Sequence, residues 1–192
     1  MIYNRINPVG IDYQIQLYQQ YLFDALIAEW SILESDYDSY GRAYRNHVGK
    51  GYTPEFFVND DYKKLIFDET LNSVASFFST SDVLEHKLGF CKQNGAMIFM
   101  FNIQRLKQSI VHRADEELKM DVLNHFQQAI KHLKTGKYGC EVTGIETGYK
   151  NVFKDFDEWS TNREQLSFSD RHPLYCMKVN LIINYNIHFK NK

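Results

Sequence analysis

Cysteine is scarce and scattered in this sequence, and that scarcity excludes a disulfide framework. The three cysteines, Cys91, Cys140 and Cys176, are widely spaced and odd in number. Each lies in an apolar or strand-like stretch, where a free cysteine usually behaves as a small hydrophobic residue. A chain of 192 residues can bury roughly two-thirds of its unfolded surface, so a stable core requires no covalent or metal cross-link.

Long apolar runs and an excess of positive charge are also missing. No run approaches the ~18 apolar residues of a membrane span, and residues 1–10 lack the basic and apolar regions of a signal peptide. We therefore expect a chain made in the cytoplasm, with no membrane partner. The formal net charge of -2 argues against a general nucleic-acid binder, whose domain should be strongly basic.

Known catalytic and metal-binding spacings are absent too. His125 and His132 stand two helical turns apart without a third ligand, and neither His-Glu-x-x-His nor Cys-x-x-Cys occurs. The acidic run from Asp36 resembles the start of a calcium loop, but its twelfth position is His47 rather than a bidentate glutamate. We expect no metal, no cofactor and no catalytic set.

What the sequence has in abundance is aromatic residues, with 14 phenylalanines and 13 tyrosines. Several tyrosines stand in polar neighbourhoods, among them Tyr37, Tyr40 and Tyr149. Aromatic side chains are enriched in protein contact surfaces, so these residues favour a partner-binding role. An AT-rich genome, which encodes more Tyr, Phe, Asn and Lys, accounts for them equally well.

Apolar residues at steps of three and four predict two long helices. The first covers about residues 12–33, with Asp12 as its N-cap. The second covers about residues 114–134, with acidic residues in its first turn and lysines in its last, as the helix dipole favours. Turn-forming residues predict a long loop over about residues 34–54, and polar residues predict another over 158–172.

Shorter apolar and β-branched segments predict strands. We expect them at residues 55–59, 64–68, 73–79, 95–103 and 140–146, with a short amphipathic piece at 151–156. The last strand alternates apolar and polar residues from Met177 to Phe189, which indicates an antiparallel or edge position with one wet face. At ~3.3 Å per residue this strand spans roughly 40 Å, so its far end should bend, project or pair with another chain. The order of elements predicts a single α+β domain over 1–192, with a mostly antiparallel sheet and the two main helices on one face.

Two groups of residues are candidate partner contacts. In the long loop, a basic and aromatic cluster could contact a phosphate or an acidic partner, and we favour a protein partner because nearby acidic residues repel a polyanion. This cluster comprises Arg42, Tyr44, Arg45, Lys50 and Tyr52. In the last strand, Tyr185, Ile187 and Phe189 are candidate subunit contacts through edge pairing.

Three stretches together resemble a known family. They are residues 142–148 (Val-Thr-Gly-Ile-Glu-Thr-Gly) with 151–156, the closing strand over 174–187, and the opening Gly-Ile-Asp at 10–12. Their order is similar to that of tail-terminator, or tail-completion, proteins in the necks of tailed bacteriophages. The Tyr- and Asn-rich segments 41–46 and 51–55 resemble ring proteins of crAss-like phages.

The resemblance implies a structural virion protein rather than an enzyme. Members of the family stack as rings, usually six- or twelve-fold, whose sheets line the channel for passing DNA without reading its sequence. Their partners are copies of themselves and neighbouring neck, portal or tail proteins. The acidic residues at 34–38 and the polar residues at 158–170 exceed the minimal fold, so which ring of the neck this chain would form stays open.

Two other functions remain open on the sequence alone. One is a monomeric adaptor or host-interaction protein that binds a partner through residues 41–52. The other is a small hydrolase or nuclease that pairs Cys91, Cys140 or Cys176 with His86 or His172.

Overall fold

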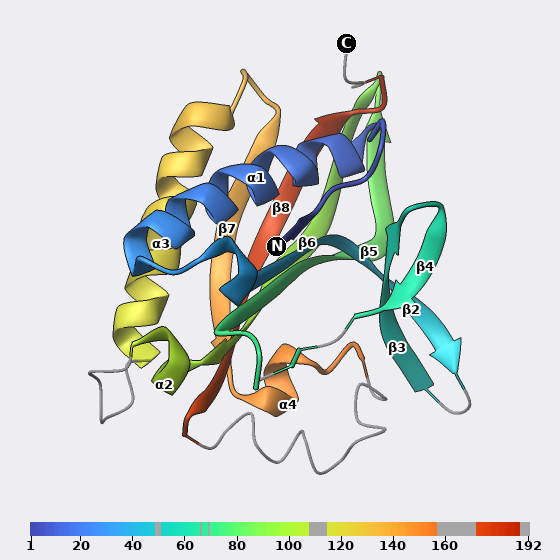
Figure 1. Cartoon of the computed structure of the whole chain (residues 1–192). Coiled ribbons are helices and arrows are strands. Elements are labelled where there is room, and N and C mark those ends of the chain that lie inside the picture. The colour runs from blue at the N-terminus through green and yellow to red at the C-terminus, as the bar shows by residue number, and fades with distance from the viewer. Residues whose placement is uncertain (49–50, 66, 69, 108–114, 157–171, 189–192) are drawn as a thin grey trace.

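The computed structural model describes residues 1–48, 51–65, 67–68, 70–107, 115–156 and 172–188. Within them the chain forms a large sheet with its two long helices on one face, so the expected α+β class is confirmed (Figure 1). The strands follow the order β4-β3-β2-β5-β6-β8-β7, and β1 pairs with the outer side of β2. All pairs are antiparallel except β1 with β2 and β2 with β5.

The helices and strands have these bounds. The helices are α1 (Ile11–Trp30), α2 (Ile103–Leu106), α3 (Asp115–Leu133) and α4 (Tyr149–Val152), with a 3-10 turn at Glu34–Asp36. The strands are β1 (Ile2–Tyr3), β2 (Tyr37–Val48), β3 (Gly51–Val58), β4 (Asp61–Lys64), β5 (Val74–Lys87), β6 (Phe90–Asn102), β7 (Gly139–Thr147) and β8 (Leu174–Asn186).

Two apolar cores lie on the two faces of the sheet. Alternate residues of β6 and β8, such as Phe99 and Val179, pack under α1 and α3. The residues between them, such as Ile98 and Cys176, pack against α4 and the bent strands β2 and β3. Burial on both faces explains why β6 reads as a continuous apolar run.

The predicted loop over residues 34–54 is wrong. This segment forms β2 and the start of β3, which pair from Ala43 opposite Phe56 to Val48 opposite Gly51. The ladder that β2 shares with β5 shifts register at Gly41. A side chain added to Gly41 would lie 3.1 Å from Gln19 Oε1, so this turn-forming residue accommodates a bulge inside a strand.

Smaller corrections concern the ends of elements. Asp12 is the second residue of α1, and Gly10 with its positive φ of 57° is the N-cap. The strand expected at 64–68 lies instead at Asp61–Lys64. The strand expected at 73–79 continues to Lys87 and forms a long hairpin with β6. The second predicted loop, over 158–172, falls outside the described residues except for His172.

The last strand is antiparallel, as expected, but it is not an edge. β8 lies between β6 and β7 and pairs with β6 from Leu174 to Asn186. Because β6 is equally long, the length of β8 is matched inside the sheet and requires no projection or second chain. Its alternating polar residues lie on the face of the sheet opposite α1 and α3, which we call the second face. Lys178 and Asn184 are nevertheless buried there.

Truncation of a core residue on α3 tests this packing. Phe126 is fully buried under the sheet, whereas the adjacent Gln127 is exposed. We expect Phe126→Ala to lower the free energy of unfolding by ~3–5 kcal/mol, and Gln127→Ala to change it by less than ~0.5 kcal/mol. Urea denaturation followed by circular dichroism measures both. A loss below ~1 kcal/mol for Phe126→Ala would contradict the placement of α3 on the sheet.

Candidate functional site

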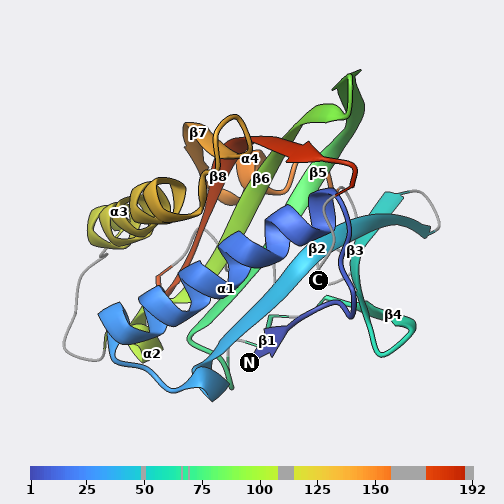
Figure 2. The same ribbon diagram turned by 90° about the horizontal axis from the view of Figure 1, so that it is seen from above.

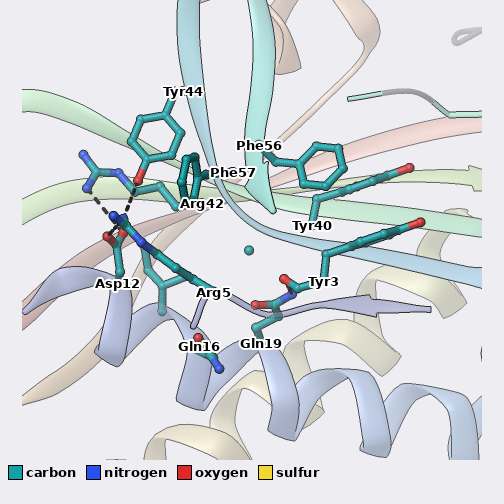
Figure 3. Close-up of a pocket in the computed structure, with 12 residues that line it drawn as sticks. Tyr3, Arg5, Asp12, Gln16, Gln19, Tyr40, Arg42, Tyr44, Phe56 and Phe57 are labelled. Carbon is teal, nitrogen blue, oxygen red and sulfur yellow. Dashed lines mark hydrogen bonds and ion pairs between the residues drawn. The ribbon is translucent and has the colours of Figure 1, made fainter. Parts of the chain in front are cut away.

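An ion-pair cluster joins the start of α1 to β2 (Figure 3). The Asp12 carboxylate accepts hydrogen bonds from Arg5, in the N-terminal segment, and from Arg42 Nη1 in β2 at 3.4 Å. Arg5 Nη1 also donates to Tyr44 Oη at 3.1 Å, and the Arg42 guanidinium lies 5.0 Å from the centre of the Tyr44 ring. Arg42 and Tyr44 were predicted from sequence, whereas Arg5 and Asp12 were not predicted as members of the same cluster.

Aromatic rings surround this cluster. Phe57 lies under the Arg5 guanidinium at 5.4 Å, and Tyr62 packs edge-on against Tyr44 at 5.6 Å. Burial, reinforced by the Asp12 charge, raises the pKa of Tyr44, so its phenol stays protonated at neutral pH. The arginines are thus held by a carboxylate and aromatic rings of the same chain. The cluster of Arg5, Asp12, Arg42 and Tyr44, which we call the clamp, joins α1 to the sheet.

A small cavity lies beside the clamp. It is lined by Tyr3, Gln16, Gln19 and Tyr40, among others (Figure 3), and its volume is about 30 Å³. The Gln19 amide donates to the carbonyl oxygens of Tyr3 at 3.3 Å and Ser39 at 2.8 Å. A space of this size accommodates about one water molecule and is too small for an organic ligand.

The other predicted contact residues in this region are Arg45, Lys50 and Tyr52. Arg45 reaches from β2 to the Asp82 carboxylate at the side of β5. Tyr52 lies in β3 opposite His47, and its side chain is outside the described part of the chain, as is the whole of Lys50. The structure therefore places Arg42, Tyr44 and Arg45 along one strand rather than in a loop.

The predicted contacts in the last strand have different environments. Tyr185 is buried, and its hydroxyl donates to Gln93 Oε1 at 3.2 Å. It packs in the core under α1 and cannot form an edge contact. Ile187 follows the end of β8 and is half-exposed, while Phe189 lies outside the described residues.

A cleft of about 730 Å³ opens on the second face of the sheet, where β2 and β5 separate. We call it the β2/β5 cleft. Its walls are residues 42–45 of β2 and 79–83 of β5, and its floor comes from β6, β7, β8 and the segment after α4. The lining residues are mainly charged, hydroxyl or amide side chains: Arg42, Tyr44, Arg45, Ser79, Thr80, Ser81, Asp82, Asn94, Glu146, Lys154, Asp155, Lys178 and Asn180.

A chain of ion pairs forms the floor of this cleft. Lys178 has a side chain only 6% exposed, and its Nζ lies 3.5 Å from Asp155 Oδ2 and 3.7 Å from Glu146 Oε1. Asn180 Nδ2 donates to the same Glu146 oxygen at 2.8 Å, and Lys154 Nζ lies 3.3 Å from the other. The hydrogen bond from Asn180, with the attraction of both lysines, lowers the pKa of Glu146 below its usual value.

The β5–β6 hairpin turns at one end of the sheet (Figure 2), and it carries exposed apolar side chains near this turn. Val83 is 73% exposed, Leu84 is 47% exposed, and Leu88 in the turn is 94% exposed. Ile187 belongs to the same end, because Asn186 pairs with Phe90 at the base of the turn. No sequence pattern indicated this feature, since the strand was expected to end near residue 79.

The described residues offer little support for a thiol nucleophile. Cys91 and Cys140 are buried, and burial raises the pKa of both thiols, which opposes formation of the nucleophilic thiolate. No group of three or more His, Cys, Asp or Glu side chains in the described ranges could hold a metal ion. None of the helices described here is long and apolar enough to cross a membrane.

No protein-family model matches the chain, and no curated protein matches it. Function therefore has to be argued from the geometry of the hairpin, the clamp and the cleft.

The Glu146 network predicts a pH-dependent contribution to stability. Because the folded-state pKa lies below the usual value of 4.5, the contribution is complete above that pH and is lost as the pH falls through the lowered pKa. We expect the difference in stability between the parent protein and Glu146→Gln to be largest near neutral pH and to vanish in acid. Urea midpoints measured across this range test it.

Glu141→Gln is the matched control for this experiment. Glu141 lies on the same strand in one exposed pair with Lys134, which contributes little to stability. A Glu146→Gln difference that stays constant from neutral pH into acid would contradict the network.

Proposed function

We propose that this chain is a structural subunit of the neck or tail of a bacteriophage, forming a ring around the DNA channel between portal and tail. The observation that carries the proposal is the β5–β6 hairpin, near whose turn Val83, Leu84 and Leu88 are exposed. Exposed apolar side chains that gather at one end of a sheet form a surface that an assembling subunit can bury against its neighbour.

The kind of assembly follows from the shape of this contact. A tip that inserts into a different surface of the next copy makes a heterologous contact, and such contacts close into rings when the rotation between copies allows it. The resemblance to tail-terminator and crAss-like ring proteins supports the six- or twelve-fold form and the location in the virion. Neighbouring neck, portal or tail proteins would contact the upper and lower surfaces of the ring.

The charge of the chain supports a channel through which DNA slides. A net charge of -2 provides no excess of cations to hold phosphates, and the clamp arginines share the Asp12 carboxylate. Passing DNA would therefore be a transient partner that is bound without sequence recognition.

Self-association tests the proposal directly. We expect the purified protein to form closed rings of uniform diameter as its concentration rises, measured by solution mass and negative-stain microscopy. Leu88→Asp should weaken self-association at least about tenfold, because a carboxylate buried in an apolar contact has lost its hydration.

Leu71→Asp is the matched control for Leu88→Asp. Leu71 is 65% exposed but precedes β5, at the opposite end of the strand from the hairpin turn. Assembly should be unchanged in this variant. A protein that stays monomeric at every concentration, even with portal or tail proteins added, would favour the monomeric adaptor and overturn the ring.

A further inference from the structure

Two strand edges face each other across the β2/β5 cleft. β2 and β5 pair in parallel from Tyr37 opposite Val74 to Arg42 opposite Phe78. In the described part of the chain, ladder pairs after that point join β2 only to β3 and β5 only to β6. The two hairpins then leave the sheet in different directions (Figure 2). The cleft is therefore a gap in an otherwise continuous sheet.

The size of the gap suits an added strand. Neighbouring strands lie ~4.8 Å apart, so one inserted strand requires walls roughly twice that distance apart. The long Arg45 side chain joins Asp82 across the mouth, where direct backbone pairing has ended. The volume of about 730 Å³ lies within the range of roughly 300–1,000 Å³ that is usual for ligand sites.

The chemistry of the walls selects the class of ligand. Rows of backbone donors and acceptors at a sheet edge are matched by an extended polypeptide, which pairs with them as a further strand. Single-stranded nucleic acid requires exposed rings for stacking. The aromatic side chains that line this cleft are Tyr44, whose ring is covered by Arg42, and Phe156, which is buried.

The charges of the cleft select the side chains of that polypeptide. The lining cations are Arg42, Arg45, Lys154 and Lys178, and the lining carboxylates are Asp82, Glu146 and Asp155. Lys154 is half-exposed and shares Glu146 with Lys178, whose second carboxylate is Asp155, so the floor itself is balanced. The lining as a whole carries four cations against three carboxylates, and this small excess favours an incoming carboxylate, while the hydroxyl and amide groups accept polar neighbours.

We propose that the β2/β5 cleft binds an extended, acidic segment of another protein chain, which adds to the sheet between β2 and β5. In a neck ring this segment would belong to a neighbouring protein. The proposal does not depend on ring closure, because Leu88 in the hairpin turn is not part of the cleft lining, although Val83 belongs to both surfaces.

A defined peptide tests the proposal with the full-length protein. The probe is a fluorescent peptide of about ten residues that alternates threonine and glutamate, titrated by anisotropy. A peptide that alternates threonine and lysine is the charge control, and an acidic peptide with N-methylated backbone is the pairing control. We expect the acidic peptide to bind at least about tenfold more tightly than either control.

Three variants locate the binding. Asn94 is exposed on the cleft floor, so Asn94→Trp fills the cleft without entering the core and should weaken binding at least about tenfold. Lys154→Glu should weaken it about fivefold or more. Lys150→Glu, an equal charge change on the exposed side of α4 and outside the lining, should leave binding within about twofold.

Each other outcome overturns the proposal. Equal affinity for the acidic and basic peptides removes the charge argument, and equal affinity for the N-methylated peptide removes strand addition. Competition by a short oligothymidine would assign the cleft to nucleic acid instead. Repeating the titration on Leu88→Asp separates the two surfaces: binding that persists there while assembly is lost shows that the cleft acts independently of the ring contact.

Discussion

The central strands β6 and β8 carry apolar side chains on both faces, and the free energy of burying both faces determines the rest of the architecture. On the first face, α1 and α3 supply a complete cover. On the second face, the cover within the described residues includes the short α4, with Val152 and Phe153, and β2 and β3, which bend so that Tyr40 and Phe56 reach the core. The bend separates β2 from β5, and the cleft lies where that cover ends.

The polar residues of β8 lie where the described residues leave the second face open as the cleft. Lys178, Asn180 and Asn184 occupy the second-face positions of a strand whose first-face positions are apolar throughout. Lys178 is too deep to be solvated, and two carboxylates compensate its charge at 3.5 and 3.7 Å. An apolar residue would fill this position at lower cost if stability were the only requirement, so the ion pairs point to a surface that has to stay polar.

Local patterns in the sequence predict the parts of the fold that depend on local forces. The apolar steps of α1 and α3, and the run that forms β6, each identify an element because its burial follows its own periodicity. β2 was missed because Gly41 and Asn46 read as turn formers, whereas Gly41 accommodates a bulge and Asn46 donates to Glu55 across the hairpin at 2.8 Å. Whether a bulge forms depends on the side chain that packs against it, here Gln19 from α1. The residues next to Gly41 in the sequence do not reveal this contact.

The candidate sites were harder to predict for a similar reason. Arg42 and Tyr44 stood out as a basic and aromatic pair, but their partners Arg5 and Asp12 lie more than two dozen residues earlier and meet them only once α1 docks. Tyr185 was predicted as an edge contact because alternation of apolar and polar residues shows which residues share a face of the strand. It does not show which strands lie on either side. The exposed hairpin depended on β5 continuing past residue 79 through a register irregularity between Thr80 and Leu84.

The central place of β8 has a consequence for synthesis. β8 is the last strand of this sequence, yet it separates β6 from β7, so every earlier strand leaves the ribosome before the sheet can close. β7 has no strand to pair with until residues 174–186 arrive, whereas α3 can already pack on α1. A prematurely terminated product would therefore expose the unpaired edges of β6 and β7, which are templates for aggregation.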